Sequence, residues 1–407
     1  MHRQTRLSRF VAHVGAMVSV CLGCAGATGA GLPELVLGNS TALTGPSAEL
    51  GLRMNLGLRA AFAEANNAGG IGGRKIRFVE MDDGYEPARV GPNMRKLTAD
   101  SQVLAIVGSV GTPTAVVSVS IANAAGVPFV GAYTGAGVLR QTPADPYVIN
   151  LRASYAEETG AMVDALIDHA GLRPEEVAFF TQRDAYGDAG FNGGLAALKR
   201  RGLRDESSIA HGRYERNTVA VENALADVLN AAVAPRAVIM VGSYAPCARF
   251  ITLASENGLN AILLNVSFVG TESLIEAAGP AAEGVIITQV VPHPESEVPA
   301  AVAFRAALNV ADETRAHTRS FTAFEGYLVG KLVVRALAGA GAEPSRESLL
   351  AAFRSLGEFD LGMGVPLRLD AEHSQACHTV WPTIVRAGRA VPVAWESLRG
   401  ARRAEVK

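Results

Sequence analysis

Apolar and polar positions along the chain follow two periods, one typical of strands and one typical of amphipathic helices. Short apolar runs such as 103–107 and 177–181 have the length and composition of buried strands. Longer windows such as 49–66 repeat apolar residues every three or four positions, as a helix with one buried face does. Strands that alternate with helices predict parallel sheets covered by helices. The expected fold class is therefore α/β.

The predicted elements form two series and a return segment. The first series has strands at 35–38, 75–81, 103–107, 128–131 and 147–151 and helices at 49–66, 88–99, 113–125 and 137–141. The second has a helix at 155–170, strands at 177–181, 237–241, 262–265 and 284–289, and helices at 187–199, 218–230 and 248–257. A proline-bearing connector at 291–294 leads to helices at 300–308, 321–337 and 345–353 and a last strand at 378–385.

Residues 1–30 have the pattern of an export signal. Arg3, Arg6 and Arg9 precede an apolar run that is followed by small residues, and cleavage is expected after Ala27 or Ala30. The run is too short to remain as a membrane-spanning helix. A second interpretation, a lipoprotein leader acylated at its second cysteine, Cys24, stays open. Both interpretations place the protein outside the cytoplasm, in the periplasm.

Composition and charge narrow the class of protein. The 49% hydrophobic and 19% charged residues indicate a globular protein with a large core, and 407 residues suit two lobes better than one. Without residues 1–30 the chain has 34 Lys and Arg against 39 Asp and Glu. Because a nucleic-acid partner requires a basic face, this balance argues against one.

A glycine turn joins the first long helix to the next strand. Asn and Gly residues at 66–73 end the helix, since glycine adopts the left-handed conformation of a helix C-terminus without steric penalty. Asp82 and Asp83 then close the strand beside Gly84, a pattern that more often serves a turn than a cation. With the strand at 35–38, these segments predict a β-α-β unit.

Three motifs carry a resemblance. Leu43-Thr44-Gly45-Pro46, the Asn-Ala-Gly-Gly-Ile-x-Gly stretch at 67–73 and Asp82-Asp83 resemble the periplasmic leucine/isoleucine/valine-binding proteins, the solute receptors of branched-chain amino-acid ABC importers. The order of the later elements matches that family to near residue 390. No single motif is diagnostic, but the series is specific.

The resemblance implies two wound parallel-sheet lobes joined by a three-segment hinge. Lobe 1 would comprise 31–153 and 292–364, lobe 2 would comprise 154–291 and 365–398, and 399–407 would be a flexible tail. Closure of the hinge would trap a small ligand in a cleft between the lobes and present a new surface to a membrane permease. The expected partners are thus a small molecule and an ABC importer, and the protein is expected to be a monomer without a cofactor.

Two loops of lobe 1 are candidates for ligand contact. Ligands of wound sheets bind beyond the carboxyl ends of the strands, where loops lead into helix N-termini. Thr112 and Thr114 lie in such a loop, and Thr112 before Pro113 is expected to cap the helix and, by the resemblance, to face the ligand carboxylate. Tyr133 and Thr134 follow the next strand, and the resemblance implies backbone and hydroxyl contacts there.

In lobe 2 the resemblance assigns cleft positions to two tyrosines, but the sequence then differs from the family pattern. Tyr186 and Tyr244 match cleft tyrosines, whereas Asp184 is expected to cap a helix or serve a turn. Amino-acid binders place a carboxylate after the following strand to pair with the ligand ammonium. Here Ser267 or Phe268 stands at that place. The family aromatic after Pro46 is likewise replaced, by Ser47.

These departures predict a ligand less polar than a free amino acid, namely a carboxylate, an amide, an aromatic or an apolar molecule such as a lipid or sterol. Two other functions stay open. One is a periplasmic carrier that hands an apolar ligand to a different transport system. The other is a ligand-sensing module, against which the leader and the lack of an output domain weigh.

Enzyme and metal signals are weak. The glycine-rich stretch at 69–73 follows a helix and precedes a strand, the reverse of the dinucleotide-binding context. His373 and His378 lack a third metal ligand nearby, so neither a metal nor catalysis is expected. Cys247 and Cys377 could pair in an oxidising compartment or stay separate buried thiols. The disulfide that the family often carries near the cleft is absent, since Tyr85 and Gly111 stand at its places.

Overall fold

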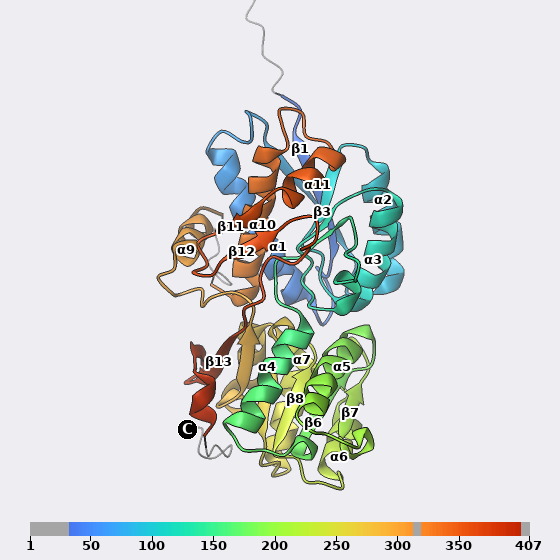
Figure 1. The fold of residues 1–407 in the computed structure, drawn as a ribbon, viewed down its shortest axis with the longest axis vertical. Coiled ribbons are helices and arrows are strands. Elements are labelled where there is room, and N and C mark those ends of the chain that lie inside the picture. Colours follow the sequence, from blue (N-terminus) through green and yellow to red (C-terminus); the bar gives the residue numbers. More distant parts are fainter. Residues whose placement is uncertain (1–31, 312–318, 400–407) are drawn as a thin grey trace, which may run out of the picture. The chain divides into compact units, whose positions relative to one another are not determined.

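The computed structural model describes residues 32–311 and 319–399 (Figure 1). The predicted leader with Cys24 and most of the predicted tail lie outside these residues. Strands and helices alternate along the described chain, and the strands form two main sheets, so the predicted α/β class is confirmed. Among the described residues, no helix is both long and apolar enough to span a bilayer.

The first sheet has five parallel strands in the order β2-β1-β3-β4-β5. Every residue of β1 and β3 is buried, which explains the apolar side chains along β3 and in the first half of β1. The strands are β1 Leu35–Thr41, β2 Ile76–Asp82, β3 Val103–Val107, β4 Phe129–Val130 and β5 Val148–Ile149, and the helices between them are α1 Ala48–Asn67, α2 Pro87–Ala99 and α3 Thr112–Ala124.

The second sheet has seven strands in the order β14-β13-β10-β9-β8-β6-β7. Five are parallel, and β13 and β14 add an antiparallel edge. Strands β7 and β14 were not predicted from the sequence, because they are edge strands with few buried residues and hence weak apolar patterns. The elements are α4 Tyr155–Asp168, β6 Val177–Gln182, α5 Ala185–Arg200, β7 His211–Tyr214, α6 Glu222–Leu229, β8 Ala237–Val241, α7 Tyr244–Glu256, β9 Ile262–Asn265, α8 Thr271–Ala278, β10 Ile286–Gln289, β13 Trp381–Arg386 and β14 Arg389–Pro392.

The return segment packs on elements of the first sheet (Figure 1). It consists of α9 Pro299–Ala311, α10 Phe321–Gly339, α11 Arg346–Arg354 and the antiparallel pair β11 Gly357–Phe359 and β12 Leu367–Leu369. Because β12 pairs with β11, the chain returns to the seven-stranded sheet only at β13. The lobe boundaries suggested by the sequence stay a prediction.

Helices α1 and α10 lie side by side through two glycines. A Cβ on Gly57 would collide with the carbonyl of Ala323, and a Cβ on Gly326 would collide with the carbonyl of Met54. Only glycine permits this approach of the two backbones. The close packing fixes α10, which carries the buried polar residues Thr322 and Glu325.

Short 3₁₀ turns complete the fold, and two cysteines lie in its interior. Cys247 in α7 and Cys377 before β13 are both buried free thiols, so the open question of a disulfide is answered in favour of separate thiols in this structure. The 3₁₀ turns are η1 Gly137–Leu139, η2 Pro174–Glu176, η3 Glu206–Ser208, η4 Ser267–Val269, η5 Gly279–Ala282 and η6 Trp395–Leu398.

Candidate functional site

The loop after β3 brings Thr112 next to Thr134 from the loop after β4. Their hydroxyl oxygens are 2.7 Å apart, and both residues are buried. The N-cap of α3 is Gly111, at φ +101°, and not Thr112, so the predicted capping role of Thr112 is wrong. A residue with Cβ is disfavoured at this φ, and glycine takes the cap position instead. The Thr114 hydroxyl donates to the Gly111 carbonyl at 3.0 Å.

Tyr133 links the two sheets. It follows β4, and its hydroxyl donates to the backbone carbonyl of Ser267, which follows β9, at 3.1 Å. The same hydroxyl lies 3.0 Å from the Thr322 hydroxyl on α10. Burial raises the pKa of Tyr133, so the phenol stays protonated and remains a donor. Loops of both sheets therefore meet at this side chain.

Phe268 lies at the centre of five buried aromatic rings, which we call the aromatic cluster. Its ring centroid is 4.5 Å from that of Tyr186 and 5.3 Å from that of Tyr133. Such separations are typical of favourable aromatic pairs. The cluster consists of Tyr85, Tyr133, Tyr155, Tyr186 and Phe268. Tyr85 and Tyr133 follow strands of the five-stranded sheet, whereas Phe268 and Tyr186 follow strands of the seven-stranded one.

Tyr186 and Tyr244 occupy different environments. Tyr186 is the second residue of α5, whose N-cap Asp184 accepts from the Tyr186 backbone N–H at 3.0 Å, as expected of Asp184. The Tyr186 hydroxyl donates to the Gly242 carbonyl at 3.3 Å. Tyr244 begins α7 and is only partly buried, and among the described residues no ring contact joins it to the aromatic cluster.

Three buried charged residues that were not predicted from the sequence lie beside the aromatic cluster. Arg152 lies between β5 and α4, Glu158 in α4 and Glu325 in α10, and none is more than 2% exposed. Arg152 Nη2 is 3.5 Å from Glu158 Oε1, and its Nη1 is 3.6 Å from Glu325 Oε1. Only Glu325 gave a signal in the sequence, since it is a charged residue inside an otherwise apolar helix. Glu158 gave none, because it resembles an ordinary acidic residue in the first turn of a helix.

Glu158 supplies a carboxylate to the loop that lacks one. It accepts from the Ser267 backbone N–H at 2.7 Å, from the Ser267 hydroxyl at 3.0 Å and from the Thr288 hydroxyl at 2.6 Å. Arg152 also donates to the Ser267 hydroxyl. Both carboxylate oxygens of Glu158 are thus engaged within the protein.

Burial and charge act against each other in this group. Burial raises the pKa of Glu325 to about 7, although Arg152 opposes the rise. Burial also raises the pKa of Glu158, against Arg152 and the hydrogen bonds from Ser267 and Thr288. For Arg152, burial favours the neutral form, but Glu325 and Glu158 outweigh it and raise its pKa, so the guanidinium stays charged.

Asp82 and Asp83 serve the local turn. Asp82 accepts from the backbone N–H groups of Leu43 and Thr44 at 2.9 and 3.1 Å and from the Thr44 hydroxyl at 2.7 Å. Arg89 also donates to Asp82, at 2.6 Å. Two of the motifs that carried the resemblance therefore contact each other. No cluster of potential metal ligands occurs among residues 32–311 and 319–399.

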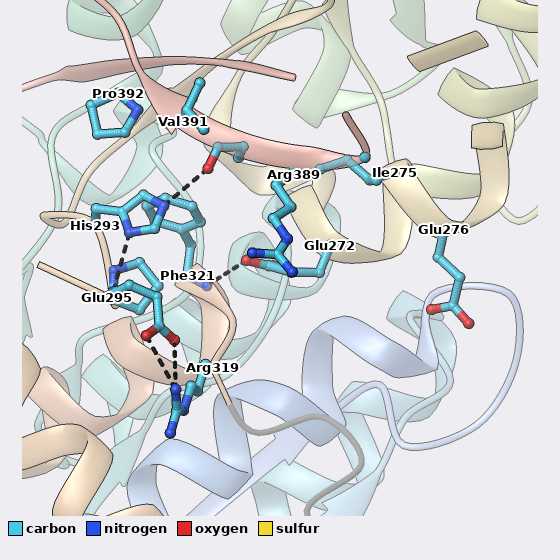
Figure 2. A pocket seen from close by; sticks show the side chains of 13 residues that line it. Glu272, Ile275, Glu276, His293, Glu295, Arg319, Phe321, Arg389, Val391 and Pro392 are labelled. Carbon is cyan, nitrogen blue, oxygen red and sulfur yellow. Dashed lines mark hydrogen bonds and ion pairs between the residues drawn. The ribbon is translucent and has the colours of Figure 1, made fainter. Parts of the chain in front are cut away.

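A surface cavity of about 850 Å³ lies apart from these residues, and none of its lining side chains is a predicted site residue (Figure 2). Its charged groups join neighbouring elements. Glu272 of α8 accepts from the Phe321 backbone N–H at 3.1 Å, and Arg319 lies 3.2 Å from Glu295. Figure 2 shows Arg389 extending over Glu272. The printed contacts of Glu272 and Arg319 are structural, and the cavity holds no predicted site residue, so the candidate site remains at the aromatic cluster.

Comparisons with known proteins agree in the class of protein. The model of the family described as "Periplasmic binding protein" matches residues 34–390. A solved structure of a possible leucine/isoleucine/valine-binding protein from Rhodopirellula baltica SH 1 is 48% identical, with a TM-score of 0.88 over 91% of this chain and 99% of that one. A substrate-binding periplasmic protein from Ralstonia solanacearum is 28% identical, with a TM-score of 0.81 over 88% of this chain and 100% of that one. An amino acid binding protein of Pseudomonas aeruginosa is 25% identical over 63% of this chain and 67% of its own length.

Proposed function

The chain belongs to the type I periplasmic binding proteins related to the leucine/isoleucine/valine-binding proteins, and from this we propose that it is an exported receptor that captures a small ligand and delivers it to an ABC importer. The observation that carries the proposal is the meeting of strand-end loops from both sheets at the aromatic cluster. Loops of this kind bind ligands in wound sheets. Separation of the two groups of loops opens the site, and their approach buries the ligand.

The ligand we propose is less polar than a free amino acid. The names of the relatives point to amino acids, but residues 265–270 contain no acid to hold an ammonium group. Glu158, the buried carboxylate beside that loop, has its oxygens occupied by Ser267 and Thr288. A carboxylate, an amide or an aromatic molecule therefore suits the site better than a zwitterion.

The site residues we propose are those predicted from the sequence together with the aromatic cluster. The five rings offer apolar surface, and the hydroxyl pair of Thr112 and Thr134 offers one hydrogen-bond donor to an acceptor, since the other proton is shared between the two hydroxyls. The predicted set is Thr112, Thr114, Tyr133, Thr134, Tyr186, Tyr244, Ser267 and Phe268.

A thermal-shift screen of the purified protein tests the function. One ligand set holds aliphatic and aromatic amino acids, a second holds simple carboxylates and amides, and a third holds detergent-solubilised lipids and sterols. A ligand that binds only the folded state raises the melting temperature. A shift in the second set supports the proposed receptor, a shift with amino acids overturns the less polar ligand, and no shift in any set contradicts a receptor for these classes.

A second candidate is a carrier of an apolar ligand for another transport system. The observation in its favour is the aromatic cluster, whose five rings offer apolar surface while the hydroxyls of Tyr133 and Tyr186 are already bonded within the protein. A shift confined to the lipid and sterol set would favour this carrier over a nutrient receptor.

A further inference from the structure

Arg152 lies where three parts of the chain meet. It follows β5, its Nη2 reaches Ser267 and Glu158 next to the seven-stranded sheet, and its Nη1 faces Glu325 on α10. The guanidinium carbon lies 4.8 Å from the ring centroid of Tyr133. Arg152 therefore borders the aromatic cluster and is 1% exposed.

The donors of this guanidinium are not all used. Nη2 donates to the Ser267 hydroxyl, but Nε and Nη1 have no hydrogen-bond partner, although both atoms are buried. The 3.6 Å between Nη1 and Glu325 Oε1 is too long for a hydrogen bond. A buried charged donor without a partner costs several times a typical net hydrogen bond, so an unpaired guanidinium edge requires an explanation.

A purely structural role does not account for these donors. Arg346, a structural arginine in α11, donates to the carbonyls of Val103, Thr98 and Asp100 with Nε and Nη2. For Arg152, by contrast, Nε has no acceptor and Nη1 has only the long ion pair with Glu325. A guanidinium edge with free N–H groups matches the two oxygens of a carboxylate.

We propose that Arg152 anchors a carboxylate group of the ligand and that the aromatic cluster holds a flat apolar group attached to it. This inference rests on the proposed function, since it names the ligand class of the same site. The ligand class is then an aromatic carboxylate, or another acid with a flat apolar body. Ring faces favour such a group, and Tyr133 contacts both Arg152 and Phe268.

Glu325 would compete with the ligand for Arg152. Because burial raises the pKa of Glu325 to about 7, its side chain is largely neutral below that pH and charged above it. The charged and titratable groups facing it are Arg152, Glu158, Arg140, Tyr133 and Cys377. Of these, Arg140 already donates to the Arg152 carbonyl at 2.9 Å and to the Ala136 carbonyl at 3.1 Å. A ligand carboxylate thus binds best when Glu325 carries a proton.

The experiment compares phenylacetate, phenylacetamide and phenylalanine by calorimetric titration of the purified protein between pH 6 and pH 8.5. Phenylacetate stays ionised throughout this range. We expect it to bind more tightly than the amide and to lose affinity above pH 7, approaching about tenfold per pH unit. Arg152→Gln should weaken phenylacetate binding by about 30-fold or more. Glu325→Gln should remove the pH dependence.

Controls separate folding from recognition. Arg346→Gln removes a structural arginine that bonds to Val103 at the start of β3, and it should leave the phenylacetate affinity unchanged. If Arg152→Gln does not fold, Arg152→Lys and the pH profile of Glu325→Gln decide. The proposal is overturned by equal affinities for phenylacetate and its amide, by a folded Arg152→Gln with unchanged affinity, or by a wild-type affinity that does not vary with pH.

Two outcomes distinguish this proposal from the proposed function. If phenylacetate does not bind but an amide or lipid does, the role of Arg152 is rejected and the receptor stands. If phenylalanine binds as tightly as phenylacetate and loses affinity equally in Arg152→Gln, the carboxylate anchor is supported and the less polar ligand is rejected.

Discussion

The hydroxyl of Tyr133 donates a hydrogen bond to the backbone carbonyl of Ser267, with 3.1 Å between the two oxygen atoms. The two residues are 134 positions apart and follow strands of different sheets. Both were predicted from the sequence as ligand contacts. Their contact is therefore a direct link between the two groups of loops that the proposed receptor would close on its ligand.

Tyr133→Phe should lower the stability of this contact without disturbing the ring packing. The ring keeps its place beside Phe268, but the hydrogen bonds with Ser267 and Thr322 are lost. A loss of about 2 kcal/mol in unfolding free energy is expected, since two hydrogen bonds are removed and the typical net value of each is about 1 kcal/mol. Urea unfolding measures it, and calorimetry should show weaker ligand binding. Unchanged stability and affinity would remove this bond from the closure mechanism.

Asp82→Asn should make the unfolding free energy less dependent on pH in the acid range. Although burial favours its protonation, hydrogen bonds from Thr44, Leu43 and Gly84, together with Arg89, hold the pKa of Asp82 well below its usual range. A folded-state pKa below the unfolded value means that its contribution is complete above about pH 4 and is lost as the pH falls further. Urea unfolding between pH 2.5 and pH 7 checks this. The wild-type advantage over Asp82→Asn should shrink only at the acid end, and a constant difference would contradict the assignment.

Gly111→Ala should be strongly destabilising. Gly111 has φ +101°, and a Cβ there would collide with the ring of Tyr85. Gly284→Ala is the matched control, because Gly284 has φ +78° but no atom within 4 Å of its Cβ position. Backbone strain of about 1–3 kcal/mol is expected for both, and an additional loss only for Gly111→Ala. Equal melting temperatures of the two variants would show that Tyr85 moves aside without cost.

Cys247 and Cys377 should resist labelling in the native protein. Both thiols are buried and unpaired, and burial raises the pKa of each, which disfavours the reactive thiolate. Iodoacetamide should modify neither residue in the folded protein and both in urea without any reductant, as measured by peptide mass spectrometry. A peptide pair that is labelled only after reduction would instead demonstrate a disulfide.

The contact between Tyr85 and Gly111 shows what could be predicted from the sequence and what could not. The resemblance placed both residues at the positions of a family disulfide, and the structure places the Tyr85 ring against Gly111. The sequence thus predicted which segments are neighbours. That a ring replaces a covalent bond there follows from packing, which depends on the three-dimensional distance between segments 26 residues apart.

Patterns along the chain are enough to predict the α/β class, the order of most helices and strands, and the loops that hold the candidate site residues. These properties depend on local periodicity and on glycine turns, which neighbouring residues specify. The surroundings of Phe268 and the grouping of Arg152, Glu158 and Glu325 are known only from the three-dimensional structure. Those three charges come from the end of one sheet and from two helices, so no spacing along the chain could bring them together. Their effect on stability and binding depends on burial, because an unpaired donor or a missing partner costs more free energy inside the protein than in water.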